Sequence, residues 1–262
     1  MSISCAQAVG TLTWHLCVDG ALPGAVNMSR DHAFARSLVP GSAVLRLYRW
    51  KRPTLSLGRN EPARGHYQQE IFRRAGVDVV RRPTGGRAVL HWRELTYAVV
   101  MPVRSLGGPR AIHRWINERI VGALAMLGVA AEIAPDPRRA LPLSAGPCFA
   151  APAAGEVTAG GRKLVGSAQL RVGDALLQHG SILLADDQER LASLLRWPIG
   201  GSDRPATLSE LLGRTPHVGE LERVLMAAFG LEAECAKDVP SRSLEESDLE
   251  KLYRSEAWTW RR

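Results

Sequence analysis

Two segments with the pattern of extended chain flank a short turn, and they constrain the fold more than any other feature. The first reads KLVGSAQL over residues 163–170, and the second reads ALLQHGSILL over residues 175–184. The turn between them contains Val172, Gly173 and Asp174. Apolar runs of this length, separated by a Gly-Asp turn, are typical of paired strands. The chain is therefore expected to build a β-sheet that includes this hairpin.

Further strands and helices are expected around the hairpin. Apolar and alternating stretches predict strands at residues 42–50, 54–58, 77–82, 88–91 and 95–103. Helical spacing predicts helices at residues 66–76, 109–128, 187–195, 207–213, 217–230 and 243–258, the last opened by a capping box of Ser243 and Glu246. This order predicts a two-layer α/β protein, in which a mixed sheet is covered on one side by helices.

The pattern changes after Ala185, where strands give way to short helices. We expect a core over about residues 12–196 and a small C-terminal helical extension over about residues 206–262, with the junction at residues 196–205. A chain of 262 residues is within reach of one large α/β domain. The expectation is therefore a single domain, residues 1–262, and not two independent ones.

Charge and cysteine content limit the class of partner and the compartment. The formal net charge is +8, which favours an acidic partner such as nucleic acid or an acidic carrier protein. The basic residues are dispersed, so no nucleic-acid-binding tail is expected. The four cysteines include no C-x-x-C pair, which argues against a zinc site of that kind and favours a reducing compartment. With neither a signal peptide nor an apolar span in view, a soluble, cytoplasmic protein without membrane contact is expected.

The segment RRPTGGRAVLH, residues 81–91, is the first candidate binding element. Its two consecutive glycines, Gly85 and Gly86, can take backbone conformations closed to other residues and can present N–H groups to a ligand oxygen. An ordinary β-turn between two strands is the competing interpretation. The neighbouring arginines and His91 favour the binding function.

Two later segments are also candidates. GGRKLVGSAQL, residues 160–170, places Lys163 near small residues that leave room beside a strand. LLQHGSILL, residues 176–184, places Gln-His-Gly-Ser between apolar runs, and buried polar groups of this kind need partners, as at the floor of a pocket. For Lys163 the alternative is an exposed lysine on an edge strand. For His179 the alternative is a histidine whose hydrogen bonds are satisfied within the core.

Cys148 differs from the other three cysteines in its setting. It lies between Pro147 and Phe149 in a predicted loop, and loops on a rigid scaffold often carry catalytic residues. A free cysteine is more commonly a small buried apolar residue, and we expect that role for the other three. A nearby cation would favour the thiolate form, and Lys163 is the candidate. Only four of the 34 basic residues are lysines, so a lysine at this place is a distinctive choice.

Taken together, these segments resemble the biotin/lipoate protein ligase superfamily. RRPTGGRAVLH is similar to its Arg-Arg-x-Thr-Gly-Gly-x-Ala-Val-x-His motif, GRKLVGSAQ to its lysine motif, and LQHGSILL to the strand that follows. NMSRDHAFA at residues 27–35 and PTLSLGRNE at residues 53–61 match a first helix and an early strand of the family. The five matches keep the family's order and span about residues 14–186.

Within the superfamily, the chain resembles the cysteine-dependent octanoyltransferases. Cys148 precedes the lysine motif, and Arg87 stands where ATP-dependent lipoate ligases carry a third glycine. The resemblance implies a biotin/lipoyl protein ligase-like fold, one catalytic domain and no cofactor. It implies octanoyl-acyl carrier protein as the donor. The implied acceptors are lipoyl domains, such as glycine cleavage H protein or 2-oxoacid dehydrogenase E2, and both kinds of partner are typically acidic.

The resemblance also implies the roles of individual residues. Cys148 would attack the donor thioester and hold the acyl group. Lys163 would stabilise the thiolate and the oxyanion and then move a proton, which an arginine cannot do because it does not give up its proton. No metal site is implied. The implied substrate-binding residues are Arg82, Thr84, Gly85, Gly86, His91, Gly166, Ser167, Gln169, His179 and Gly180.

Two departures from the family pattern leave substrate and donor preference open. Trp92 stands where the family often has an acidic residue, and the AAPAAGEVTA stretch at residues 150–159 replaces the usual bulky residues. An amidotransferase that moves octanoyl between lipoyl-domain proteins would share the Cys–Lys pair. An ATP-dependent lipoate ligase is a further alternative, against which Cys148 and Arg87 argue. A non-catalytic acyl- or carrier-binding protein on the same fold is the last.

Overall fold

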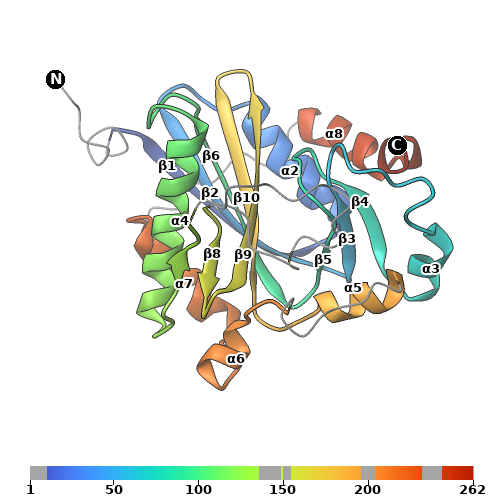
Figure 1. Ribbon diagram of the computed structural model, residues 1–262. Helices are drawn as coiled ribbons and strands as arrows, with labels where there is room; N and C mark the ends of the chain where they lie inside the picture. Colours follow the sequence, from blue (N-terminus) through green and yellow to red (C-terminus); the bar gives the residue numbers. More distant parts are fainter. Residues whose placement is uncertain (1–10, 136–148, 150–154, 196–203, 232–243, 262) are drawn as a thin grey trace.

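The structure is a computed structural model that describes residues 11–135, 149, 155–195, 204–231 and 244–261. Its strands are β1 (Thr13–Leu22), β2 (Ser42–Trp50), β3 (Thr54–Leu57), β4 (Asp78–Arg81), β5 (Val89–His91), β6 (Glu94–Pro102), β7 (Glu132–Ile133), β8 (Val157–Ala159), β9 (Arg162–Val172) and β10 (Ala175–Leu183). Its helices are α2 (Gly24–Arg36), α3 (Gln69–Arg74), α4 (Pro109–Met126), α5 (Gln188–Leu195), α6 (Leu208–Leu212), α7 (Val218–Ala228), α8 (Leu244–Arg254) and α9 (Glu256–Thr259). Figure 1 carries the same labels.

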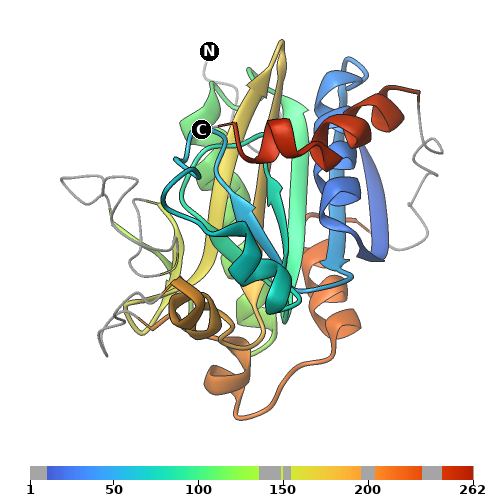
Figure 2. The ribbon, with the colours of Figure 1, turned by 90° about the vertical axis from the view of Figure 1, so that its right-hand side faces the viewer.

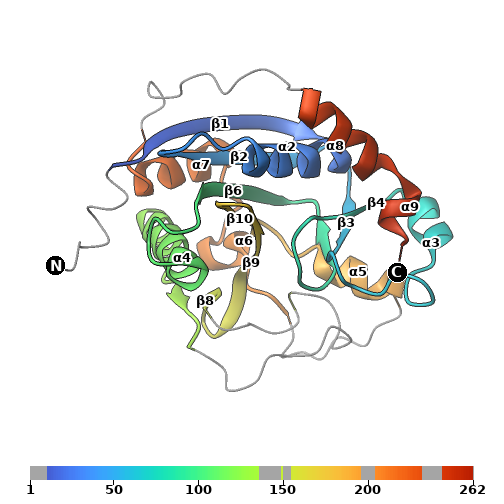
Figure 3. The ribbon, with the colours of Figure 1, turned by 90° about the horizontal axis from the view of Figure 1, so that it is seen from above.

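The strands form two sheets of unequal size. Seven of them make a large sheet in the order β1-β2-β6-β10-β9-β8-β7, in which β1 and β2 are parallel and the other neighbours are antiparallel. β3 pairs with β4 in parallel and with β5 antiparallel to make the second sheet. Figures 1 and 3 both show this smaller sheet to the right of β9 and β10. The expected mixed-sheet α/β fold is confirmed.

Helices cover both faces of the large sheet, where the sequence predicted one covered face. In β2, Leu45 and Leu47 join an apolar core with α4 and α7, whereas Val44 and Tyr48 join another with α2 and α8. Successive side chains of a strand point to opposite faces, so this strand contributes to both cores. On the second face α2 contacts β2, β6 and β10, and the C-terminal helix α8, red in Figure 2, lies beside α2.

Most of the predicted elements are confirmed, with shifts of a few residues at their ends. The opening hairpin is β9 and β10, paired antiparallel as expected. The sequence analysis missed β1, β7 and β8, and the helix expected to run to Trp258 is divided at Ser255 into α8 and α9. The predicted cap residue Ser243 and residues 196–203 of the predicted junction lie outside the described residues.

The C-terminal helices pack onto the sheets. α7 contacts α4, α8 contacts α2, and α9 contacts β4. Leu208 of α6 and Leu221 of α7 are fully buried in the core that also contains β2 and β6. Over the ranges that the structure describes, no helix combines the length and the apolar character needed to cross a membrane.

Candidate active site

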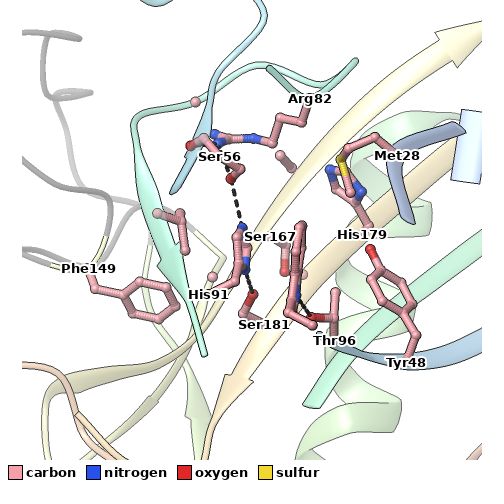
Figure 4. A pocket seen from close by; sticks show the side chains of 16 residues that line it. Met28, Tyr48, Ser56, Arg82, His91, Thr96, Phe149, Ser167, His179 and Ser181 are labelled. Atoms are coloured by element: carbon pink, nitrogen blue, oxygen red, sulfur yellow. Dashed lines mark hydrogen bonds between the residues drawn. The ribbon is translucent and has the colours of Figure 1, made fainter. Parts of the chain in front are cut away.

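A pocket lies between the large sheet and the three-stranded sheet, and Figure 4 shows it from close by. β9 and β10 line it from the large sheet and β3 and β5 from the small one, with contributions from α2, β2 and β6. Of the predicted substrate-binding residues, those that line it are Arg82, Gly86, His91, Gly166, Ser167, His179 and Gly180. Its other lining residues are Met28, Tyr48, Trp50, Ser56, Val89, Thr96, Phe149, Ala168 and Ser181.

Three predicted binding residues lie outside the pocket lining. Thr84 is fully buried, and its hydroxyl is 2.7 Å from Nε2 of His179 in the pocket wall. Gly85 directly precedes the lining residue Gly86, and its carbonyl accepts a hydrogen bond from Arg82. Gln169 donates hydrogen bonds to the carbonyl of Pro109 and to Oε1 of Gln178. Gln178 in turn donates to the Tyr97 hydroxyl, which is 2.7 Å from Oγ of the lining residue Ser167. Thr84 therefore bonds a wall residue directly, and Gln169 is connected to the wall through Gln178 and Tyr97.

Arg82 holds the Gly-Gly loop by its carbonyl oxygens, and Arg81 holds the segment after β3 against which that loop packs. Arg82 donates to the carbonyls of Gly85 and Arg87, at 2.7 and 2.8 Å. Arg81, which is fully buried, donates to the carbonyl of Gly58 at 2.6 Å. The rigid guanidinium fork suits this task because it offers five N–H donors in a fixed plane. Arg82 thus fixes the loop in addition to lining the pocket.

The loop packs so closely against β3 that Gly58 has no room for a side chain. A Cβ at Gly58 would lie 1.8 Å from the carbonyl oxygen of Gly86. Gly86 itself has a φ of 89°, a conformation that strongly favours glycine. The unusual backbone conformation expected of the Gly-Gly pair is therefore present at Gly86, which packs against Gly58.

Gly58→Ala should displace the Gly-Gly loop and lower the free energy of unfolding by about 1–3 kcal/mol, because the clash is with backbone and cannot be relieved by a rotamer. Urea unfolding measures the change. Gly122→Ala is the matched control, since its Cβ would meet nothing within 4 Å on α4, and it should leave stability unchanged or raise it. Equal stabilities for the two variants would show that the loop is not held at Gly58.

His91 is held by a network of short hydrogen bonds at the end of β5. Its Nδ1 is 2.7 Å from Oε1 of Glu94, and its Nε2 is 2.7 Å from Oγ of Ser56. Trp50 stacks on the ring with centroids 4.1 Å apart. In the neutral tautomer that donates from Nδ1 to the carboxylate, Nε2 accepts from the serine hydroxyl. The partly exposed Trp92 takes no part in these bonds, and the carboxylate that bonds His91 belongs to Glu94, three positions after the histidine.

The side chain of His179, in β10, is held by a network of buried charged groups. Its Nδ1 is 2.9 Å from Oδ2 of Asp31, which also accepts hydrogen bonds from Tyr48 at 2.8 Å and Arg46 at 2.6 Å. Burial opposes ionisation of Asp31 and is the largest single effect, but Arg46, His179 and Tyr48 together outweigh it and lower the pKa of the carboxyl below its ordinary value. Burial also lowers the pKa of His179, which favours the neutral ring. His179 can then donate to Asp31 and accept from the Thr84 hydroxyl.

Lys163 lies in β9 with its side chain almost fully buried. Its ammonium is 2.7 Å from Oε1 of Glu156 and 4.8 Å from the centre of the Phe149 ring. A Cβ at Gly166 would lie 2.9 Å from Cε of Lys163 and 3.0 Å from Phe149 Cζ. Lys163 therefore lies directly behind two residues of the pocket lining, and it is not the exposed edge lysine of the alternative interpretation. Cys148 lies outside the described residues.

The sequence analysis missed three buried acids that organise this site: Asp31, Glu94 and Glu156. Each pairs with a residue that was predicted, namely His179, His91 and Lys163. Asp31 falls within the matched NMSRDHAFA segment, which gave a signal that was not used. Across the described residues, no group of three His, Cys, Asp or Glu side chains could hold a metal ion.

The family model of the lipoyl protein ligase A/B catalytic domain matches residues 23–230. An octanoyltransferase LipM from Kyrpidia tusciae is 39% identical over 279 residues, covering 95% of this chain and 99% of the relative. An octanoyltransferase LipM from Carboxydothermus hydrogenoformans is 34% identical over 268 residues, with the same coverage.

Solved structures agree with the fold. A lipoate-protein ligase A bound with ATP has a TM-score of 0.75 at 23% identity, covering 95% of this chain and 99% of that chain. A bipartite lipoate protein ligase from Thermoplasma acidophilum, studied with its E2 lipoyl domain, has a TM-score of 0.68 at 20% identity, covering 95% and 96%. With a family model that matches most of its length and relatives that match nearly all of it, the chain belongs to the lipoyl protein ligase A/B catalytic domain family.

Proposed function

We propose that this chain is an octanoyltransferase of lipoate biosynthesis that works through a Cys148 thioester. The observation that carries the proposal is the buried Lys163 ammonium behind the pocket wall, 4.8 Å from the ring of Phe149. Phe149 directly follows Cys148 in the sequence, and consecutive Cα atoms are about 3.8 Å apart. This neighbourhood supports the pairing of a thiolate at Cys148 with the ammonium of Lys163.

The proposed reaction has two balanced steps. The Cys148 thiolate attacks the carbonyl of an octanoyl thioester, a new carbon–sulfur bond forms, and the carrier leaves as a thiolate that takes up a proton. The amine of the acceptor lysine then attacks the Cys148 thioester, forms an amide, gives up a proton and releases Cys148. Lys163 stabilises negative charge on sulfur and on the carbonyl oxygen in both steps. Because the thioester is already activated, neither ATP nor a cofactor is needed.

The pocket suits the acyl group in this scheme. Its lining includes Met28, Trp50, Val89 and Phe149, which offer apolar surface to a hydrocarbon chain. The predicted residues His91, His179, Gly86 and Gly166 lie in the same lining and are proposed to bind the substrate. The network bonds of the two histidines fix these walls before substrate arrives.

The proposed donor is octanoyl-acyl carrier protein, and the proposed acceptor is a lysine of a lipoyl domain, as in glycine cleavage H protein or an E2 subunit. The relatives named octanoyltransferase LipM support the octanoyl group, and the net charge of +8 supports acidic protein partners. The packing of α7 on α4 and of α8 on α2 supports one catalytic domain that includes the C-terminal helices. A cytoplasmic location is proposed from the cysteine usage.

The test offers the purified protein three donors, each with a lipoyl domain as acceptor. We expect octanoyl transfer from octanoyl-acyl carrier protein without ATP, and little or none from free octanoate with ATP and Mg²⁺. Faster transfer from an octanoylated H protein would assign the chain to the amidotransferases. Transfer from free octanoate that depends on ATP would contradict the proposal and indicate a ligase.

A further inference from the structure

The Lys163 ammonium is held by a carboxylate from its own hairpin. Glu156 Oε1 is 2.7 Å from Lys163 Nζ, and the two side chains are 6% and 1% exposed. Glu156 directly precedes β8, and its carbonyl accepts from the backbone N–H of Ala134 at 2.7 Å. The carbonyl of Lys163, in β9, accepts from the backbone N–H of Ala206 at 2.9 Å. Both ends of the ion pair are thus anchored through the backbone.

The pocket wall lies on another side of the same ammonium. The Phe149 ring and Gly166 contact the Lys163 side chain there, and both line the pocket. A cation over an aromatic face is attracted by the ring. The Phe149 ring therefore stabilises the position of the ammonium together with the Glu156 carboxylate. The lysine head group is therefore fixed between Glu156 and the pocket wall.

We propose that Glu156 is a positioning residue for acyl transfer, whose carboxylate keeps Lys163 charged and fixes its ammonium beside Phe149. The inference rests on the proposed function, because it gives Glu156 its role through Lys163. A buried ammonium deprived of its counter-ion gives up its proton more readily. A neutral Lys163 would stabilise neither a thiolate nor an oxyanion, so removal of Glu156 would impair both steps.

Other titratable groups face this ion pair from the neighbouring elements. His113 of α4 has its pKa lowered by burial, against the opposing effect of Glu156, so it is neutral at neutral pH. Tyr97 of β6 has its pKa raised to about 12, mainly by burial, so it is also neutral. Arg162, next to Lys163 in β9, is paired with Glu210. Among the described residues that face Lys163, Glu156 supplies the negative charge.

The first test reads the charge of Lys163 directly in the free enzyme. The chain has four lysines, so ¹³C-lysine labelling gives four side-chain signals, and Lys163→Met assigns the one that matters. In Glu156→Gln, Lys163 should convert to the neutral amine at a pH at least about one unit lower than in the wild type. Glu156→Asp should lie between the two. Glu210→Gln, which removes the same charge from the neighbouring Arg162 pair, should leave the Lys163 titration unchanged.

The second test measures octanoylation of the enzyme by octanoyl-acyl carrier protein as a function of pH. Glu156→Gln should lower the rate at least about tenfold at neutral pH and move the alkaline fall in rate to lower pH, while Glu156→Asp recovers part of the loss. Glu210→Gln should stay within about twofold of the wild type. If Glu156→Gln does not fold, the smaller shift in Glu156→Asp carries the test.

Two results would overturn the inference. One is a Glu156→Gln or Glu156→Asp enzyme in which both the Lys163 titration and the pH profile match the wild type. The other is equal loss of rate in the Gln and Asp variants without any shift in pH, which would assign Glu156 a purely structural role. A separate result would contradict the proposed function itself: a Lys163→Met enzyme that transfers octanoyl at the wild-type rate.

Discussion

Replacing Cys148 with serine should lower the rate of octanoyl transfer by at least about 10³-fold, the scale seen when a covalent nucleophile is removed. Serine keeps nearly the same size and shape, but its hydroxyl does not ionise near neutral pH, and no acyl-enzyme can form through a thiolate. Stability should change little, because the substitution replaces one small side chain with another. Steady-state transfer from octanoyl-acyl carrier protein to a lipoyl domain measures the rate.

Cys17 in β1 provides the matched control for this substitution. Burial, aided by Asp19, raises the pKa of Cys17 to about 11, so its thiol is protonated at neutral pH and is a poor nucleophile. Cys17→Ser should therefore keep the wild-type rate within about twofold. Wild-type activity in Cys148→Ser, or an equal loss in the two variants, would contradict a specific role for Cys148.

Replacing Asp31 with asparagine should lower the free energy of unfolding by about 3–5 kcal/mol, the usual cost of removing one partner of a buried ion pair. Asparagine keeps the shape, but the fully buried Arg46 loses the fully buried one of its two carboxylate partners and keeps only the partly exposed Asp19. Arg46, His179 and Tyr48 together outweigh burial and keep the pKa of Asp31 below its unfolded value of about 3.9. The charged form therefore stabilises the fold at neutral pH, and this stabilisation is lost as the pH falls through the folded pKa. The difference between wild type and variant should therefore shrink in strong acid.

Urea unfolding at several pH values measures this effect, and Glu245→Gln is the control. Glu245 pairs with Arg36 at 2.8 Å, but both side chains are well exposed, so its loss should cost no more than about 1 kcal/mol. Similar stability changes for the two variants would show that burial does not strengthen the Asp31 network. A neutral-pH cost for Asp31→Asn below about 1 kcal/mol would contradict the account of how His179 is held.

The sequence predicted the elements whose patterns are local. The hairpin of β9 and β10, the helix α4 that starts at Pro109, and the strands β2 and β6 all have apolar spacing that is visible within a short window. β7 and β8 have two and three residues, too few for a periodic signal. β1 does alternate, with Trp14, Leu16 and Val18 between His15, Cys17 and Asp19, and this local signal was not used. The last helix is divided at Ser255, where the sequence has no glycine or proline to predict a break.

The sequence analysis predicted the reactive side chains but not their partners. Lys163, His91 and His179 were predicted from motif and resemblance, and each lies in the pocket wall or directly behind it. Asp31, which bonds His179, is 148 positions away along the chain. Such pairs exist only after helices and strands have packed, so no local pattern can reveal them. Glu156 is close to Lys163 in sequence, but its role depends on how the β8–β9 hairpin pairs.

The central claim is that the acyl group passes through Cys148, and the mass of the enzyme tests it most directly. The protein is incubated with octanoyl-acyl carrier protein in the absence of an acceptor, and intact-mass measurement is followed by peptide mapping. The account predicts one octanoyl group per chain, on the peptide that contains Cys148, released when a lipoyl domain is added and absent from Cys148→Ser. Octanoyl transfer to the lipoyl domain without any such adduct, or an adduct on a different residue, would contradict it.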